Sequence, residues 1–233
     1  MDRERWLAGR RVAVEHAYTE EGSTYDDGYD PATPIHRRFV ARMIESVPPG
    51  GSVLDAACGT APYAGMVLDA DLSYLGVDQS AGMLERARTK WPDARFEQVG
   101  LQELAFEATF DAVMCTDAME NVSPEDWPVV ASSFGRALRP DGHLYLTVEQ
   151  VERGELEEAF ARASAEGLPA VFGEVVEGDT AGYHFYPDRR QVDEWLARAG
   201  FRSVARADEW LDGYGYHHQL MRVLQDERGM SSS

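Results

Sequence analysis

The chain has 233 residues, with 41 acidic and 22 basic side chains and a formal net charge of −19 at pH 7. This length suits one large domain, and a hydrophobic content of 44% is enough for a sizeable core. The acidic balance argues against nucleic acid and against an anionic membrane surface as partners, because both require clustered Lys and Arg.

The cysteines and the N-terminal residues indicate in which cellular compartment the protein is expected. Cys58 and Cys115 fall at the ends of predicted core strands, which favours a reducing compartment. Residues 1–11 are charged and lack the apolar core of a signal peptide, and no apolar run approaches the roughly 20 residues of a membrane helix. We therefore expect a cytoplasmic protein, with a flexible tail over residues 226–233.

In chain order, the first predicted element is a helix over residues 5–20, followed by a loop over residues 21–34 that is rich in Gly, Asp, Tyr and Pro. Residues 36–47 carry apolar side chains at helical spacing, which predicts a helix packed on a sheet. Two prolines and two glycines at residues 48–51 end this helix.

Strands and helices then alternate. The predicted strands lie near residues 52–56, 73–77, 94–98, 110–115 and 142–149, and the helices near residues 62–69, 80–90 and 124–138. Such alternation predicts a parallel sheet with helices on both faces, whose ligands bind at the carboxyl ends of the strands. Four side chains fall at such ends: Asp55, Asp78, Leu101 and Thr116.

The last third of the chain is predicted to begin with an acidic helix over residues 155–166. A loop-rich insertion follows up to Gly182, and then a helix over residues 188–199. Two final strands, near residues 201–209 and 216–224, complete the sheet.

The most informative segment is residues 53–63. Its pattern predicts a buried strand, a turn of small residues and the start of a helix. Ala57 and Gly59 are small enough for a ligand to lie against the backbone. Asp55 places a carboxylate at the turn, whereas a pyrophosphate-binding loop uses bare backbone N–H groups. The turn therefore favours a ligand that bears an ammonium and a carboxylate.

A second acid follows at the expected distance. In doubly wound folds, an acid about 20 residues past the glycine turn binds a pair of ribose hydroxyls. Asp78, at the end of the predicted strand over residues 73–77, fits that role, and Ser80 is placed to cap the next helix.

These residues resemble motif I of the class I S-adenosylmethionine-dependent methyltransferases, whose usual form is hydrophobic-hydrophobic-Asp-x-Gly-x-Gly-x-Gly. The chain departs from it at Ala57, where the first Gly is common, and at Ala61 or Pro62, where the last is common. The resemblance spans residues 35–225. It implies an α/β, doubly wound, Rossmann-like sheet of seven mostly parallel strands with helices on both faces.

The resemblance also implies two additions to the core. Residues 1–34 are expected to form an N-terminal helical lid over the cofactor. An insertion over about residues 150–187, after the fifth strand, is expected to cap the site. Tyrosines of the lid near the sulfonium would gain cation–π stabilisation.

The implied cofactor is S-adenosylmethionine, with S-adenosylhomocysteine as product and no metal. The expected cofactor-binding residues come from the lid, motif I, and the segments after the second, third and fourth strands: Tyr25, Asp55, Ala57, Gly59, Thr60, Asp78, Gln79, Met83, Gly100, Leu101, Gln102 and Thr116. Met83 is expected against the adenine, with a core position as the alternative. An Asp common at Gly100 or Leu101 is missing; Gln102 can substitute for it, or lie on a helix surface instead.

Methyl transfer by in-line displacement needs no covalent enzyme intermediate, so a strong catalytic signature is not expected. His184 and Glu120 are the candidate proton acceptors. The alternatives are a structural hydrogen bond for His184 and a helix-entry position for Glu120. The expected substrate-binding residues are Tyr29, Met119, Tyr183 and Tyr186, which favour an aromatic or apolar small molecule.

A metal site is not predicted. His217 and His218 are adjacent in a predicted strand, so they point to opposite faces and cannot form a metal pair. The chain has no His-x-x-x-His, paired Cys or Asp-rich triad.

The leading hypothesis is a methyltransferase that acts on an oxygen, nitrogen or carbon atom of a small molecule. A second keeps the cofactor but replaces methyl transfer by cyclisation or decarboxylation. A third is a nicotinamide-dependent dehydrogenase, against which Asp55 and the missing glycines count, and a fourth is a non-enzymatic interaction domain. Oligomeric state is not predicted.

Overall fold

The computed structural model describes residues 2–27, 32–177, 182–211 and 213–224. Its main feature is a seven-stranded sheet in the order β3-β2-β1-β4-β5-β9-β8. The strands are β1 (Ser52–Ala56), β2 (Ser73–Asp78), β3 (Arg95–Gln98), β4 (Phe110–Cys115), β5 (Leu138–Val151), β8 (Phe201–Trp210) and β9 (Tyr214–Val223). β1 to β5 are parallel, and β9 is antiparallel to both β5 and β8. The predicted sheet of seven mostly parallel strands is confirmed.

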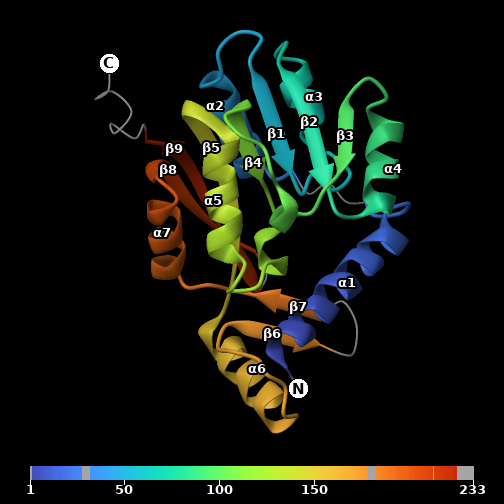
Figure 1. Cartoon of the computed structure of the whole chain (residues 1–233), viewed down its shortest axis with the longest axis vertical. Helices are drawn as coiled ribbons and strands as arrows, with labels where there is room; N and C mark the ends of the chain where they lie inside the picture. The colour runs from blue at the N-terminus through green and yellow to red at the C-terminus, as the bar shows by residue number, and fades with distance from the viewer. Residues whose placement is uncertain (1, 28–31, 178–181, 212, 225–233) are drawn as a thin grey trace.

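Helices cover both faces of the sheet (Figure 1). α2 (Pro34–Glu45), α3 (Ala64–Leu68) and α4 (Ala81–Lys90) contribute to one apolar core, and α5 (Trp127–Ala137) and α7 (Arg189–Arg198) to the other. Within β1 the neighbours Val53 and Leu54 enter opposite cores, as strand alternation requires. The strand order reverses between β1 and β4, so ligands are expected outside the carboxyl ends of these strands.

Local capping explains where several helices start. Ser80 accepts a hydrogen bond from the backbone N–H of Met83, as its N-cap position predicts. The helix predicted over residues 124–138 instead begins at Trp127. The Ser123 hydroxyl accepts from the Asp126 backbone N–H and closes a separate turn before the helix.

Two strands occur where the sequence predicted only loop. After α6 (Arg153–Ala165), β6 (Glu174–Glu177) and β7 (Gly182–Phe185) form a separate antiparallel pair. Each is only four residues long, too short for a clear alternating pattern. In Figure 1 this pair and α6 lie beyond the edge of the sheet towards which the parallel strands point.

α1 (Arg3–Glu21) runs from the β6–β7 pair to α4 (Figure 1). At its start, the Arg3 guanidinium pairs with the buried carboxylate of Glu174 at 2.8 Å, and the Trp6 ring packs edge-on against Tyr183 at 5.8 Å. At its end, a Cβ atom on Gly82 would overlap the carbonyl oxygen of Thr19. α1 is thus docked on the core at both ends, and at α4 the backbones touch directly.

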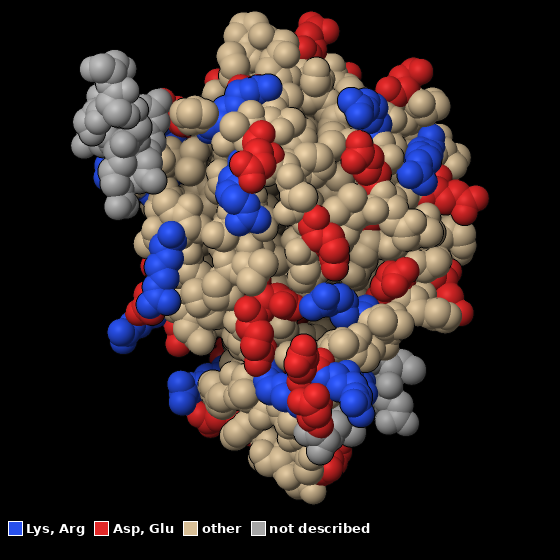
Figure 2. Space-filling view, in the orientation of Figure 1, with Lys and Arg blue, Asp and Glu red and all other residues tan. Residues whose placement is uncertain are grey.

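The molecular surface shows mixed charge. On the face in Figure 2, Lys and Arg side chains of the described residues are interspersed with Asp and Glu and form no continuous basic area. None of the described helices has both the length and the apolar composition needed to span a bilayer.

Candidate functional site

A cavity opens at the carboxyl ends of β1, β2 and β4 and encloses about 730 Å³ of empty space, including its mouth. Its walls come from α1, the turn after β1, the end of β2, α4 and the segments after β3 and β4. The lining residues are Arg11, Val14, Tyr18, Tyr25, Ala57, Gly59, Asp78, Gln79, Met83, Val99, Leu101, Gln102, Asp117, Ala118, Asn121 and Val122.

The turn after β1 exposes its backbone to the cavity. Ala57 has φ 56° and Gly59 has φ 52°, so both adopt the left-handed conformation that reverses the chain within a few residues. The space where a Cβ atom of Gly59 would lie is open. A ligand can therefore approach the backbone at Gly59 closely.

Asp78 is held in place by backbone amides. Its carboxylate accepts hydrogen bonds from the N–H groups of Gly59 and Ser80, both at 2.8 Å. Burial raises the pKa of this carboxyl, and these amide hydrogen bonds oppose the rise. Each carboxylate oxygen can accept a further hydrogen bond, so the group is placed to bind a pair of hydroxyls.

The cavity brings together most, but not all, of the residues predicted to bind a cofactor. Eight of them line it: Tyr25, Ala57, Gly59, Asp78, Gln79, Met83, Leu101 and Gln102. The other four, namely Asp55, Thr60, Gly100 and Thr116, are not in its wall.

Two of these four are engaged elsewhere. Asp55 is buried beneath the turn and accepts a hydrogen bond from the Tyr74 hydroxyl at 2.7 Å. Burial raises the pKa of Asp55 to about 7, against the Tyr74 hydrogen bond that lowers it. Thr60 donates to Asp26 at 2.6 Å, and Lys90 also binds Asp26 at 2.9 Å. Asp55 thus supports the turn from below, and Thr60 ties the N-terminal segment to it.

Asp117, not Thr116, reaches the cavity from the end of β4. Asp117 has a left-handed backbone conformation, with φ 50°. The side chain therefore does not follow the alternation of β4. Its carboxylate accepts from the Thr147 hydroxyl at 2.9 Å and lies 3.0 Å from Nε2 of the buried His36. Asp117 is not among the residues predicted from the sequence, because no local motif distinguishes it.

Glu120 is a buried carboxyl next to the cavity. One oxygen accepts from the Asn121 side-chain amide at 3.2 Å, and the other has no hydrogen-bond partner in the described part of the chain. Burial, and after it the charges of Glu149 and Asp117, raises the pKa of Glu120 well above its usual value. Burial therefore favours the neutral form of Glu120 more strongly than it is favoured in an exposed glutamate.

Three tyrosine phenols lie close enough to Glu120 to interact with it electrostatically. Burial, and after it neighbouring carboxylates that include Glu120, raises the pKa of Tyr18, Tyr186 and Tyr216. All three phenols are therefore neutral at neutral pH. This cluster of Glu120, Tyr18, Tyr186 and Tyr216, called the phenol–carboxyl cluster below, is better suited to a neutral aromatic molecule than to an anion.

The other residues predicted for catalysis or substrate binding lie outside the cavity wall. Met119 is buried in the apolar core. The Tyr183 hydroxyl donates to Glu174 at 2.7 Å, so Tyr183 helps to anchor α1. His184 is on β7, where burial lowers its pKa and its ring lies 5.9 Å from that of Tyr186. Tyr29 falls outside the described residues.

Comparison with known proteins finds similarity to methyltransferases. Residues 53–142 match the family described as a methyltransferase domain. The demethylmenaquinone methyltransferase of Renibacterium salmoninarum is 27% identical over 177 residues, which cover 72% of this chain and 73% of that protein.

Two solved structures share the fold. A SAM-dependent methyltransferase from Methanosarcina mazei has a TM-score of 0.70 at 16% identity and covers 83% of this chain and 99% of its own. The 1,6-didemethyltoxoflavin-N1-methyltransferase of Burkholderia thailandensis, solved with 1,6-didemethyltoxoflavin and S-adenosylhomocysteine, has a TM-score of 0.68 at 17% identity. It covers 97% of this chain and 92% of its own.

Proposed function

Since the chain is a class I S-adenosylmethionine-dependent methyltransferase that acts on a small molecule, we propose that its acceptor is an aromatic ring compound of the quinone type. The observation that carries this proposal is the phenol–carboxyl cluster beside the cavity, whose groups are all shifted towards their neutral forms. The curated relative named above is a demethylmenaquinone methyltransferase, and one structural neighbour binds 1,6-didemethyltoxoflavin. Both names support a small-molecule acceptor of this kind.

The residues around the cavity fit the cofactor. The open space beside Gly59 admits a ligand against the backbone, and Asp78 has acceptor capacity for the ribose hydroxyls. Met83, Val99 and Leu101 offer apolar side chains for the adenine. S-adenosylmethionine supplies an electrophilic methyl group on a sulfonium.

The protein then has to orient the acceptor and accept the proton that the acceptor loses. Tyr18 and Asn121 reach the cavity beside Glu120, and Asp117 reaches it from the end of β4. In its protonated form Glu120 donates a hydrogen bond to an oxygen of the acceptor. In its ionised form it takes a proton from the acceptor, and its raised pKa makes it an effective base. We assign this role to Glu120 rather than to His184.

α1 and the insertion would exclude water from the site. α1 supplies Arg11, Val14 and Tyr18 to the cavity wall, which supports the proposed lid over residues 1–34. The segment of about residues 150–187 supplies Tyr186 to the phenol–carboxyl cluster, which supports its proposed role as a cap. Excluding water strengthens the electrostatic interactions around the reacting atoms.

For the location, we propose the cytoplasm. Cys58 and Cys115 are both free and buried. Burial raises the pKa of both thiols, which keeps them protonated and unreactive, as in proteins of a reducing compartment.

The experiment is a methylation assay with a chemically graded set of acceptors. Purified protein is incubated with S-adenosylmethionine and either a short-chain demethylmenaquinol, a simple catechol or an aliphatic amine. S-adenosylhomocysteine and the methylated product are measured by mass spectrometry. The proposal predicts turnover with the quinol above that with the other two, whereas a preference for the aliphatic amine would contradict it.

A further inference from the structure

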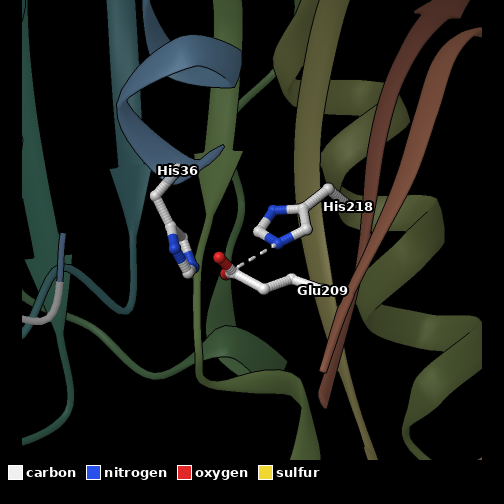
Figure 3. Close-up of side chains that lie close together, drawn as sticks. All are labelled: His36, Glu209 and His218. Atoms are coloured by element: carbon white, nitrogen blue, oxygen red, sulfur yellow. Dashed lines mark ion pairs between the residues drawn. The ribbon is translucent and has the colours of Figure 1, made fainter. Parts of the chain in front are cut away.

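A second group of chemically active side chains lies beside the cavity, on the other side of Asp117. His36 of α2, Glu209 of β8 and His218 of β9 converge there (Figure 3). One ligand atom from each, two imidazole nitrogens and a carboxylate oxygen, lie within 4.8 Å of one another. Both histidine side chains are fully buried, and the Glu209 side chain is 22% exposed.

The hydrogen bonds of His36 leave its Nδ1 facing the centre of this group. Nε2 lies 3.0 Å from the Asp117 carboxylate, and a proton on Nε2 satisfies this contact because a carboxylate accepts. Nδ1 lies 2.8 Å from the Thr33 hydroxyl, which is also 3.0 Å from the Glu209 carboxylate. In the neutral tautomer with its proton on Nε2, the single Thr33 hydroxyl proton faces two acceptors, Nδ1 of His36 and the Glu209 carboxylate.

His218 adds a third acceptor to the same place. Its Nδ1 is hydrogen-bonded to the Tyr145 hydroxyl at 2.9 Å. Its Nε2 is buried, has no hydrogen-bond partner within the described residues and lies 3.8 Å from the Glu209 carboxylate. In the tautomer that donates its Nδ1 proton to Tyr145, Nε2 presents a lone pair towards Glu209. Nε2 of His218 thus faces the Glu209 carboxylate at a position where a bound cation would satisfy both groups.

We propose that Nδ1 of His36, Nε2 of His218 and the Glu209 carboxylate bind a divalent transition-metal ion, with zinc as the best match. Two imidazoles and one carboxylate are a common ligand set for zinc, which leaves a fourth position for water or another ligand. The partly exposed Glu209 gives the ion a route from solvent, and it is the ligand with the most freedom to close on it.

The surrounding residues supply the outer contacts that metal-binding histidines usually have. Asp117 accepts from the far nitrogen of His36, and Tyr145 bonds the far nitrogen of His218. Such partners fix the ring orientation and the tautomer of a ligating histidine. Because Asp117 also lines the cavity, the metal would hold one wall of the methyl-transfer site through His36. We therefore assign the ion a positioning role, against the sequence-based expectation of no metal.

The test uses the full chain, stripped of metal with a chelator and dialysed. Zinc affinity is measured by competition with a chromophoric chelator, and cobalt(II) is used as a spectroscopic probe of coordination. The proposal predicts one ion per chain and cobalt absorption in the visible range typical of four-coordination. It also predicts a rise in melting temperature with zinc, because the ion joins α2 to the β8–β9 pair.

Three variants make the test specific. Glu209→Gln and His218→Gln should each weaken zinc binding by at least about tenfold. His217→Gln is the matched control, since His217 is equally buried on the same strand but faces Asp208 at 2.6 Å on the opposite side. It should leave zinc affinity unchanged. Because Glu209 is partly exposed, Glu209→Gln tests the site even where His218→Gln does not fold.

Two results would overturn the proposal. One is the absence of stoichiometric zinc binding to the stripped wild-type chain. The other is an equal zinc affinity in the wild type and Glu209→Gln, which would place the ion elsewhere. Both results come from zinc binding and not from methyltransferase activity. They therefore test the metal site even if the proposed quinone-type acceptor is wrong.

Discussion

Asp78 and Asp117 both offer carboxylates to the cavity, and they are held in different ways. Asp78 accepts from two backbone amides, so its position follows from the local fold of the turn. Asp117 depends on the side chains of Thr147 and His36 from distant segments. Asp78 is therefore suited to a fixed binding role, whereas the position of Asp117 responds to changes at His36.

At Glu120, the substitution Glu120→Gln tests the assigned proton transfer. The amide keeps the size and a hydrogen-bond donor but cannot take a proton, so we expect kcat to fall by about a hundredfold. Affinity for S-adenosylhomocysteine should stay within about twofold. Steady-state kinetics and calorimetry measure the two quantities.

The matched control for Glu120 is Glu166→Gln, the same chemical change at an exposed position on the end of α6. It should leave kcat unchanged. A Glu120→Gln variant with the turnover of this control would remove Glu120 from the mechanism and leave it a structural role.

Asp55 predicts a pH dependence of stability. Its folded-state pKa of about 7 lies above the value of about 3.9 in an unfolded chain. Between these two pH values the folded state binds a proton on Asp55 that the unfolded state has released. The resulting contribution to the free energy of unfolding is complete below about pH 4 and is lost as the pH rises towards 7. The difference corresponds to about 4 kcal/mol in the free energy of unfolding.

The substitution Asp55→Asn isolates this contribution from the other titrating groups. Asparagine stays neutral, so the variant should gain stability relative to the wild type as the pH rises from about 4 to about 7. Urea unfolding at several pH values in that range measures the difference. A constant difference across the range would show that Asp55 has no raised pKa.

At the scale of elements, α1 completes the cavity wall through a close contact between glycine backbones. Gly22, which follows α1, and Gly82 near the start of α4 leave no space for a Cβ atom between the two segments. The other end of α1 depends on the Arg3–Glu174 ion pair and the Trp6–Tyr183 contact. The contribution of Arg11, Val14 and Tyr18 to the cavity therefore depends on a geometry that larger side chains would disturb.

The substitution Gly82→Ala tests this dependence. A methyl group there overlaps the Thr19 carbonyl oxygen, so α1 has to move away from α4. We expect the affinity for S-adenosylhomocysteine to fall by about tenfold or more while the circular dichroism spectrum is unchanged. Calorimetric titration measures the affinity.

Gly9→Ala is the control, because a Cβ atom at Gly9 of α1 meets nothing within 4 Å. Alanine in a helix interior favours the helix by about 1 kcal/mol, so this variant should bind normally or better. Equal affinities of the two variants would mean that the α1–α4 contact does not shape the cavity.

At the scale of the whole molecule, the sheet and the local part of the site could be predicted from the sequence. Strand–helix alternation predicted the layered fold, and the spacing of Gly59 and Asp78 predicted one wall of the cavity. These features depend on residues close together in the chain. The β6–β7 pair escaped prediction because its strands are short and lack a period.

The rest of the site depends on contacts between distant segments. His36 and Asp117 are 81 residues apart, and no short motif relates them. α1 has only two buried residues, Trp6 and Val14, so its sequence pattern does not show which face meets the cavity. Glu209 and His218 meet His36 only once the β8–β9 pair has joined the sheet. These contacts depend on the topology of the folded sheet, so sequence motifs could not predict them.

The central claim, that this cavity binds S-adenosylmethionine, is tested most directly by calorimetric titration. Wild type, Asp78→Ala and the exposed control Asp93→Ala are titrated with S-adenosylmethionine, S-adenosylhomocysteine and NADH. We predict micromolar binding of both adenosyl ligands to the wild type and the control, loss of binding in Asp78→Ala, and no binding of NADH. Failure of both adenosyl ligands to bind the wild type, or a preference for NADH, would contradict the account.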